Sequence, residues 1–510
     1  MRAPRLYLGV VRGRRFGHDP DGHDALVLLS TAAAALLDHA DGGTLSQLIE
    51  RLAHGDDRRR AALRDAAPLL LRSGLLRSPG LQPRGPANAG GRTFHLWLHL
   101  TNACNLDCPY CYIDKSKARL DPATEQAMLS SIEQTAKAGA WPRIHARFAG
   151  GEPMLQFGAM RRVYDEAVRR CAVHGVRFSA AILTNGTVVP DGAPEWVAER
   201  GIGLSISVDG LGETQDRMRP KLGGGGSFAL LQRGMARWRS AGLRPYVLIT
   251  VGESNLAGLE ALTAWLLEQG LAFRYSLVRD LEWGVVDLAD QRGAQRCGDL
   301  RPDAFDPGIL DGDALDRVRA TFHRCYDLIE AHVGAQVDAG AQVTPPFRAT
   351  HHFCDLSLWR PIQKACGAGE TYLAIGDSGG LSPCQAALHG AGDSTLRPDV
   401  PLDVQLRDHK PFGAFRRTTG NETCNRCRHK PSCAGGCPLL LHRREGHIEG
   451  RSPYCEVFRA VIPRIVRIAA LEQLGRQQQA QRDRVAERAG QELGLELAPQ
   501  LELEPQLELG

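Results

Sequence analysis

Apolar residues in the middle of the chain alternate between two spacings. Short, nearly continuous apolar runs are typical of buried parallel strands, and six occur, at 94–100, 144–148, 178–183, 203–208, 246–251 and 273–278. Between these runs, apolar residues recur every three or four positions, which predicts helices over 123–138, 158–174, 193–200, 228–241 and 256–269. Strands that alternate with helices form parallel sheets. We therefore predict an α/β fold, with a partial (β/α)6 barrel over residues 92–285.

Residues 1–85 show a different pattern. Strand or helix-start candidates at 6–11 and 24–29 precede Thr44, which is placed to cap a helix. A second helix, over 58–72, ends at a glycine and is followed by two leucines suited to a wing strand. This order predicts a winged-helix-like domain. The Pro- and Gly-rich residues 79–91 are typical of a linker.

The part of the chain after the predicted barrel divides into three pieces. Residues 286–350 contain one long amphipathic helix pattern and are expected to form a helical connector. Residues 351–465 hold eight cysteines and form a further domain. Residues 475–510 are dominated by Gln, Glu and Leu and are predicted to be a low-complexity tail.

Composition limits the possible partners. The chain has 510 residues and a net charge of +4, with no apolar stretch of membrane-spanning length. Its basic residues are scattered, whereas nucleic-acid binding requires a concentrated basic face. We therefore expect a cytoplasmic protein that binds neither membrane nor nucleic acid. Fourteen cysteines in a reducing compartment indicate metal ligation.

The first predicted barrel strand leads into three closely spaced cysteines, Cys104, Cys108 and Cys111. A closed zinc or iron-sulfur site normally takes four ligands. A metal cluster held by these three would therefore keep one position open for a substrate or cofactor. A zinc loop with a distant fourth ligand, or a small disulfide knot, is the alternative.

The C-x3-C-x2-C spacing, with Tyr110 before the last cysteine, resembles the loop of the radical S-adenosylmethionine (radical SAM) enzymes. In that family, three cysteines hold a 4Fe-4S cluster whose open iron chelates the amino and carboxylate groups of S-adenosylmethionine. The resemblance implies that Cys104, Cys108 and Cys111 are the catalytic cluster ligands of an oxidoreductase. It also implies that a 5'-deoxyadenosyl radical is generated.

Further candidates follow the later strands, where ligands bind in such folds. Glycines allow close approach of the backbone, and a carboxylate can accept hydrogen bonds from an ammonium group. Arginine can pair with the methionine carboxylate, and Arg219 is preferred over Arg217 for this role. The residues expected to bind the cofactor are Tyr110, Gly150, Gly151, Glu152, Pro153, Asn185, Ser207, Asp209 and Arg219.

The C-terminal cysteines resemble the SPASM extension of radical SAM enzymes, which carries two auxiliary 4Fe-4S clusters. The resemblance assigns one cluster to Cys424, Cys427, Cys433 and Cys455. It assigns the other to Cys366, Cys384 and Cys437, with Cys354 as fourth ligand or with one position open. The protein would then hold three 4Fe-4S clusters. A double zinc ribbon is the alternative.

The apolar pattern of residues 1–85 resembles PqqD-like peptide-recognition domains, which bind a leader peptide as an added strand. A DNA-binding or purely structural winged helix is the alternative. Taken together, the resemblances imply a peptide maturase acting on a ribosomal precursor peptide with a leader. It would install a carbon–carbon cyclophane or a thioether crosslink, with flavodoxin or ferredoxin as electron donor.

Two other functions remain open. Anaerobic sulfatase-maturating enzymes share both cysteine arrays, but they carry an Asp as general base where this chain has Gln385. A neutral amide is a poor proton acceptor. The second possibility is a non-enzymatic iron-sulfur electron carrier or scaffold, which would not cleave S-adenosylmethionine.

Overall fold

The computed structural model describes residues 1–22, 26–78, 92–279, 312–347, 353–359, 361–390, 394–408, 421–445, 448 and 450–492. The predicted linker at 79–91, the first part of the connector and the end of the tail lie outside the described residues, as does Cys297. No helix in these ranges is both long enough and apolar enough to cross a membrane.

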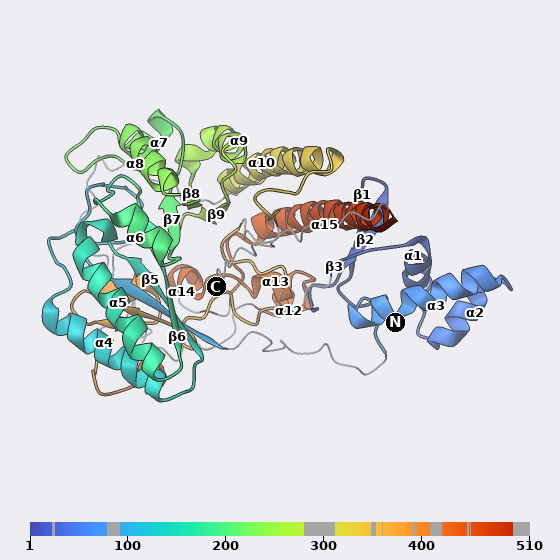
Figure 1. The fold of residues 1–510 in the computed structure, drawn as a ribbon, viewed down its shortest axis with the longest axis horizontal. Coiled ribbons are helices and arrows are strands. Elements are labelled where there is room, and N and C mark those ends of the chain that lie inside the picture. Colours follow the sequence, from blue (N-terminus) through green and yellow to red (C-terminus); the bar gives the residue numbers. More distant parts are fainter. Residues whose placement is uncertain are drawn as a thin grey trace.

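An eight-stranded sheet forms the centre of the molecule, in the order β11-β10-β4-β5-β6-β7-β8-β9 (Figure 1). The six predicted strands are confirmed and run parallel. They are β4 (Thr93–His99), β5 (Arg143–Ala149), β6 (Arg177–Thr184), β7 (Gly203–Ser207), β8 (Tyr246–Val251) and β9 (Phe273–Leu277). The α/β prediction is therefore confirmed, with a parallel sheet of the kind found in partial barrels.

The five predicted helices are also present and lie along the outer side of the sheet (Figure 1). They are α4 (Pro122–Lys137), α5 (Phe157–Val173), α6 (Ala193–Glu199), α8 (Phe228–Ser240) and α9 (Leu259–Glu268). Asp121 caps α4 by accepting hydrogen bonds from the backbone N–H groups of Ala123 and Thr124. Strand residues such as Phe148 and Ile182 are fully buried in the main core. Successive side chains of a strand point to opposite faces of the sheet. The candidate site residues follow the C-terminal ends of these strands.

Two strands of the sheet were not predicted. β10 (Tyr372–Ile375) adds to the sheet parallel to β4, and β11 (Leu381–Ser382) pairs antiparallel with β10. They are too short to show a periodic pattern, and β4, the strand that β10 joins, lies far away in the sequence. The C-terminal region thus extends the barrel sheet directly.

The N-terminal region forms a three-stranded antiparallel sheet followed by three helices. Thr44 caps its second helix in a capping box with Gln47, as predicted from the sequence. The segment Leu75–Leu76, predicted as a wing strand, forms an isolated antiparallel bridge with the N-terminus: Arg2 pairs with Leu76, and Ala3 N–H donates to the Leu75 carbonyl. The elements are β1 (Tyr7–Val11), β2 (Arg14–His18), β3 (Leu26–Leu28), α1 (Thr31–Asp38), α2 (Leu45–Ala53) and α3 (Asp57–Arg72).

The remaining helices join the N-terminal unit to the barrel. The long helices α10 (Gly312–Asp338) and α15 (Cys455–Glu492) pack together, and β1 and β3 pack on α15 (Figure 1). Val11, Phe16 and Leu28 belong to the same apolar core as the barrel strands. Residues 1–85 are therefore attached by an apolar interface as well as by the linker. The short helices are α7 (Glu213–Met218), α11 (Leu402–Asp408), α12 (Glu422–Arg426), α13 (Lys430–Cys433) and α14 (Pro438–Glu445).

Candidate functional site

The three-cysteine loop leaves the end of β4 and is held from two sides. On one side, Thr101 Oγ1 donates to the Ala118 carbonyl at 2.6 Å. On the other, Asp107 N–H donates to the Pro220 carbonyl at 2.7 Å. Cys104, Cys108 and Cys111 are all free thiols. The fold thus presents the three predicted ligands on one anchored loop.

Gly150 and Gly151 follow β5 and pack directly against this loop. The N–H of Gly151 donates to the Thr101 carbonyl at 2.7 Å, and that of Glu152 donates to the Ala103 carbonyl at 2.8 Å. A Cβ on Gly151 would lie 2.2 Å from the Ala103 carbonyl oxygen. Gly150 has φ = 139°, a conformation that side chains disfavour. The glycines therefore allow the two loops to pack against each other. From the sequence, they were expected only to allow a ligand to approach the backbone.

Glu152 lies entirely inside the protein at the junction of β5 and β6. One carboxylate oxygen accepts hydrogen bonds from Met154 N–H and Thr184 Oγ1, and the other from Asn185 N–H at 2.8 Å. Burial raises the pKa of Glu152 to about 7, although these hydrogen bonds oppose the shift. Three of roughly four acceptor positions are thus used within the chain. Pro153 opens the short 3-10 turn Pro153–Gln156 that follows.

Asn185 makes contacts that the sequence did not reveal. Its amide nitrogen donates to Asn105 Oδ1 at 2.9 Å and lies 3.8 Å from Cys104 Sγ. Its oxygen accepts from the Thr187 backbone and hydroxyl groups. Asn105 and Thr187 are therefore site residues that were missed, although both stand beside predicted ones. Ser207, the last residue of β7, is half-buried.

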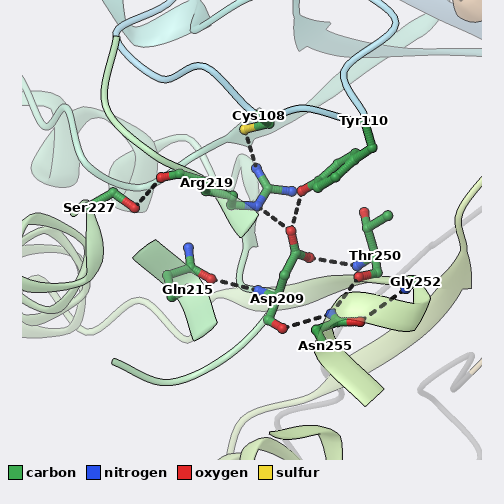
Figure 2. Close-up of polar contacts among 9 residues, drawn as sticks. All are labelled: Cys108, Tyr110, Asp209, Gln215, Arg219, Ser227, Thr250, Gly252 and Asn255. Carbon is green, nitrogen blue, oxygen red and sulfur yellow. Dashed lines mark hydrogen bonds and ion pairs between the residues drawn. The ribbon is translucent and has the colours of Figure 1, made fainter. Parts of the chain in front are cut away.

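Asp209, just beyond β7, is the centre of a hydrogen-bond network (Figure 2). One carboxylate oxygen accepts from Tyr110 OH and from Arg219 Nε, the latter at 2.6 Å. The other accepts from Thr250 N–H at 2.7 Å. The carboxylate therefore joins the cysteine loop to the end of β8.

The backbone of the same network is fixed by polar side chains that the sequence did not single out. Asp209 N–H donates to Gln215 Oε1, and Asn255 Nδ2 donates to the Asp209 carbonyl, both at 2.8 Å (Figure 2). Ser227 Oγ donates to the Arg219 carbonyl at 2.6 Å. Because all of these groups are buried, the network holds Asp209 and Arg219 in one position.

Arg219 and Arg217 point in different directions. The Arg219 guanidinium is buried, lies 5.6 Å from the centre of the Tyr110 ring and places Nη1 4.0 Å from Cys108 Sγ. Burial raises the pKa of the Cys108 thiol to about 12, and the Arg219 charge opposes that shift. Arg217 donates instead to the exposed Ser254 carbonyl. Of the two candidates, only Arg219 reaches the cysteine loop.

The cysteines that follow the barrel were predicted to form two sets of cluster ligands. We call Cys366, Cys384 and Cys437 the first auxiliary set, and Cys424, Cys427, Cys433 and Cys455 the second. Burial raises the pKa of Cys384 to about 11, with a further contribution from the neighbouring Cys437, whereas Cys366 is exposed at the surface. Asp355, which was not predicted, acts electrostatically on all three thiols. Cys354 lies at the side of this group.

Arg279 sits between Cys354 and the first auxiliary set. Its Nη2 donates to both carboxylate oxygens of Asp355, at 2.7 and 2.9 Å, and lies 3.5 Å from Cys354 Sγ. Asp355 and its arginine partner therefore surround the predicted fourth ligand. The sequence did not indicate this pair, because Arg279 and Asp355 are 76 residues apart and stand in no motif.

The second auxiliary set gathers Cys424 from α12, Cys427 directly after that helix, Cys433 from α13 and Cys455 from α15. Burial raises the pKa of Cys433 to about 11, and the other three thiols add to the shift. The four cysteines line a cavity of about 980 Å³ bounded also by α10 and α15. The predicted set is thus assembled from α12 and the residue after it, from α13 and from the first residue of α15.

Residues 98–263 match the family model described as the radical SAM superfamily. The match begins at the end of β4 and includes the cysteine loop, Glu152, Asp209 and Arg219. The central domain is a radical SAM domain.

Curated relatives align beyond the radical SAM domain. A PqqA peptide cyclase of Methylocella silvestris is 26% identical over 378 residues, covering 71% of this chain and 87% of that protein. A serine-type anaerobic sulfatase-maturating enzyme of Klebsiella aerogenes is 26% identical over 374 residues, covering 71% and 82%. An uncharacterized protein of Methanocaldococcus jannaschii is 30% identical over 178 residues, and this alignment spans 35% of the chain and 59% of that protein.

A solved structure shares the fold around the radical SAM domain. The structure of anSMEcpe with bound AdoMet superposes with a TM-score of 0.55 at 15% sequence identity. The superposition covers 75% of this chain and 98% of that one. At this level of identity the likeness concerns the fold alone.

The thiol arrangement in and beyond the radical SAM domain can be tested against the two metal alternatives. A tetrahedral zinc ion with Zn–S bonds of about 2.3 Å holds its sulfurs about 4 Å apart. Among the residues that the structure describes, no three His, Cys, Asp or Glu side chains gather around a single-ion site. A four-iron cluster binds each thiolate through a different iron and therefore needs a wider ring. The described cysteines are free thiols, a donor type that both a four-iron cluster and a zinc ion accept.

Proposed function

We propose that this protein is a radical SAM enzyme that modifies a ribosomally synthesised precursor peptide. A 4Fe-4S cluster held by the chain would, once reduced by one electron, supply the cleavage of S-adenosylmethionine into methionine and a 5'-deoxyadenosyl radical, and the radical would remove hydrogen from an unactivated carbon. The observation that carries the proposal is the Tyr110–Asp209–Arg219 network, because it places a buried cation beside Cys108 at the end of the parallel sheet. A structural metal knuckle has no need of such a cation.

The chain's own residues would divide the binding work. Cys104, Cys108 and Cys111 would hold the catalytic cluster, leaving one iron for the cofactor. Arg219, kept in place by Asp209, would neutralise the methionine carboxylate. Within the described residues no donor reaches the carbonyl oxygens of Gly150 and Gly151, so these oxygens are available to the methionine ammonium group.

The glutamate and asparagine have supporting roles in this proposal. The carboxylate of Glu152 is mostly occupied by hydrogen bonds within the chain. It would fix the loop whose carbonyls face the cofactor. Asn185, with Ser207, would approach the ribose and carboxylate oxygens, while Pro153 and Tyr110 shape the walls.

A peptide substrate is supported by the relatives and by the N-terminal sheet. Relatives named as a peptide cyclase and a sulfatase-maturating enzyme align over 71% of the chain. β3 pairs with β2 on one side, and in the described part of the chain no strand pairs with its other side. A leader peptide would add there as a strand. The product would be a carbon–carbon or thioether crosslink, and the auxiliary sets would take up the electron released after bond formation.

Oxidation of a sulfatase side chain is the second candidate, and one contact disfavours it. The residue after Cys384 is Gln385, whose amide oxygen accepts a hydrogen bond from Tyr372 OH at 2.6 Å. A neutral, already engaged amide cannot take the proton that this oxidation releases. The proton or electron must leave by another route.

The experiment is S-adenosylmethionine cleavage by the anaerobically reconstituted protein with dithionite. Changing Cys104, Cys108 and Cys111 together to Ala should abolish 5'-deoxyadenosine formation and remove about one third of the iron, since two of three thiolate-bound clusters remain. Cys171→Ala, at a buried thiol in α5 outside all three sets, is the matched control. Continued cleavage by the triple variant would refute the assignment, and no cleavage by the wild type would revive the electron-carrier interpretation.

A further inference from the structure

The cavity lined by the second auxiliary set opens among basic side chains. It is lined by residues of α10, α12, α13 and α15. We call the cations around it the basic face. They are Arg5, Arg319, Arg426, Arg428, Lys430, Arg451 and Arg459.

Contrary to the expectation of scattered basic residues, positive charge is concentrated in this part of the sequence. Residues 409–459 contain ten Lys or Arg and four Asp or Glu, a net charge of +6. The whole chain carries only +4, so the rest of the molecule is slightly acidic. A basic region on an otherwise near-neutral protein attracts an acidic partner to one place.

Only part of the basic face is neutralised internally. Glu456 pairs with both Arg451 and Arg459, the latter at 3.5 Å. Asp316 pairs with Arg319 at 3.1 Å, and Asp21 pairs with Arg5 at 2.8 Å. Among the described residues, no carboxylate pairs with the remaining three cations, Arg426, Arg428 and Lys430.

The unpaired arginines face solvent. Arg426 and Arg428 are exposed and stand on either side of Cys427 in the sequence. Water and salt screen exposed guanidinium groups, so these two charges contribute little to the electrostatic stabilisation of a cluster bound on the inner side of the same loop. They are, however, available to a partner that approaches this loop from outside.

The basic face lies beside one of the two C-terminal thiol sets. Cys433 and Cys437 belong to different sets but are only four residues apart, so their Cα atoms are at most about 14 Å apart. The two C-terminal thiol sets are therefore neighbours, and the set that lines the cavity is the one next to the basic face.

We propose that the basic face is the docking surface for a small acidic electron-carrier protein. This inference rests on the proposed function and locates its electron supply. In the step, the reduced carrier loses one electron and the enzyme gains one, and no bond or proton is exchanged. Complementary charge would orient the carrier with its redox group toward Cys427, as in other electrostatically steered encounters.

The test is flavodoxin binding to the reconstituted full-length enzyme, measured calorimetrically at low and high salt. The Arg426→Glu/Arg428→Glu variant should bind at least about tenfold more weakly at low salt, and the difference should shrink as salt screens the charges. Arg233→Glu/Arg239→Glu, on exposed positions of α8, makes the same charge change elsewhere and should bind as the wild type does. Iron content should be equal in all three proteins.

A kinetic measurement separates docking from a structural effect. With flavodoxin as reductant, the double variant should need about tenfold more flavodoxin for half-maximal cleavage of S-adenosylmethionine. With dithionite, its rate should match the wild type.

Unchanged flavodoxin affinity would overturn the proposal. So would weaker binding of a precursor peptide or an RNA oligonucleotide with flavodoxin binding intact, since the face would then serve that ligand. Failure of cleavage with both reductants in the wild type would refute the proposed function while leaving the binding result interpretable.

Discussion

Replacing Gly151 with Ala tests whether the close contact between two loops is what positions the catalytic cysteines. The added methyl carbon would lie 2.2 Å from the Ala103 carbonyl oxygen and 2.8 Å from that of Asn102. Both obstacles are backbone atoms of the cysteine loop, so no side chain can rotate away. The loop must move by about 1 Å to restore van der Waals contact.

The cost of this movement has two parts. The hydrogen bonds from Gly151 N–H to Thr101 and from Glu152 N–H to Ala103 would be stretched or lost, at about 1 kcal/mol each. Overpacking in a rigid environment adds about 1–3 kcal/mol. The sum, about 3–5 kcal/mol, corresponds to at least a hundredfold change in an equilibrium. A displacement of about 1 Å can by itself reduce a rate a hundredfold.

We therefore expect Gly151→Ala to lower 5'-deoxyadenosine formation at least about a hundredfold. Iron content should fall by no more than the share of one cluster, because the auxiliary sets lie on other elements. Gly158→Ala is the matched control: it makes the same change in α5, where the nearest atom is the end of the Arg162 side chain at 3.9 Å. It should leave activity unchanged and stabilise the helix slightly.

Wild-type cleavage by Gly151→Ala would refute the reasoning, since it would mean that the loops separate without consequence. A loss of activity in both glycine variants would also refute it, because the effect would then not depend on the contact with Ala103. Equal iron content with reduced cleavage would place the damage in cofactor positioning.

Two further predictions concern buried charge. Asp209→Asn leaves the buried Arg219 without its carboxylate, which typically costs about 3–5 kcal/mol, so affinity for S-adenosylmethionine should fall markedly in equilibrium binding. Burial, together with the Arg147 charge, lowers the pKa of His145 to about 3 from 6.5. Below pH 6.5 the unfolded chain therefore binds a proton that the folded chain does not, and stability falls as the pH decreases toward 3. His145→Gln should reduce the drop in melting temperature between pH 7.5 and pH 5.

Each of these has a result that would contradict it. Asp209→Asn with unchanged cofactor affinity would mean that Arg219 needs no carboxylate to hold its position. For the pH dependence, His323→Gln on the exposed side of α10 is the control. If it narrows the drop in melting temperature as much as His145→Gln does, burial is not the cause.

The barrel and the main cysteine loop could be predicted because their signals are local. Continuous apolar strands and 3.6-residue periodicity depend on neighbours in the sequence, and the six parallel strands appear where that pattern placed them. The spacing of Cys104, Cys108 and Cys111 is equally local. The three thiols stand within eight consecutive residues, so their proximity is visible in the sequence, although contacts with other loops hold them in position.

The contacts that give the other candidates their roles could not be predicted. Gln215, Asn255 and Thr250 fix Asp209 from three different segments, and none stands in a motif. Glu152 was expected to face the cofactor, yet the structure uses its carboxylate to join β5 to β6. Hydrogen-bond partners far apart in the sequence leave no periodic trace, so only folding reveals them.

The sequence by itself determined the alternation of strands and helices, the positions of the cysteine sets and the choice of residue types at the strand ends. The tertiary structure decided which of these residues meet. It added β10 to the barrel sheet through pairing with β4, packed the N-terminal sheet on α15, and brought Asp355 and Arg279 beside the first auxiliary set. The physical reason is range: propensity and spacing act over a few residues, whereas burial and charge pairing act wherever the folded chain brings groups together.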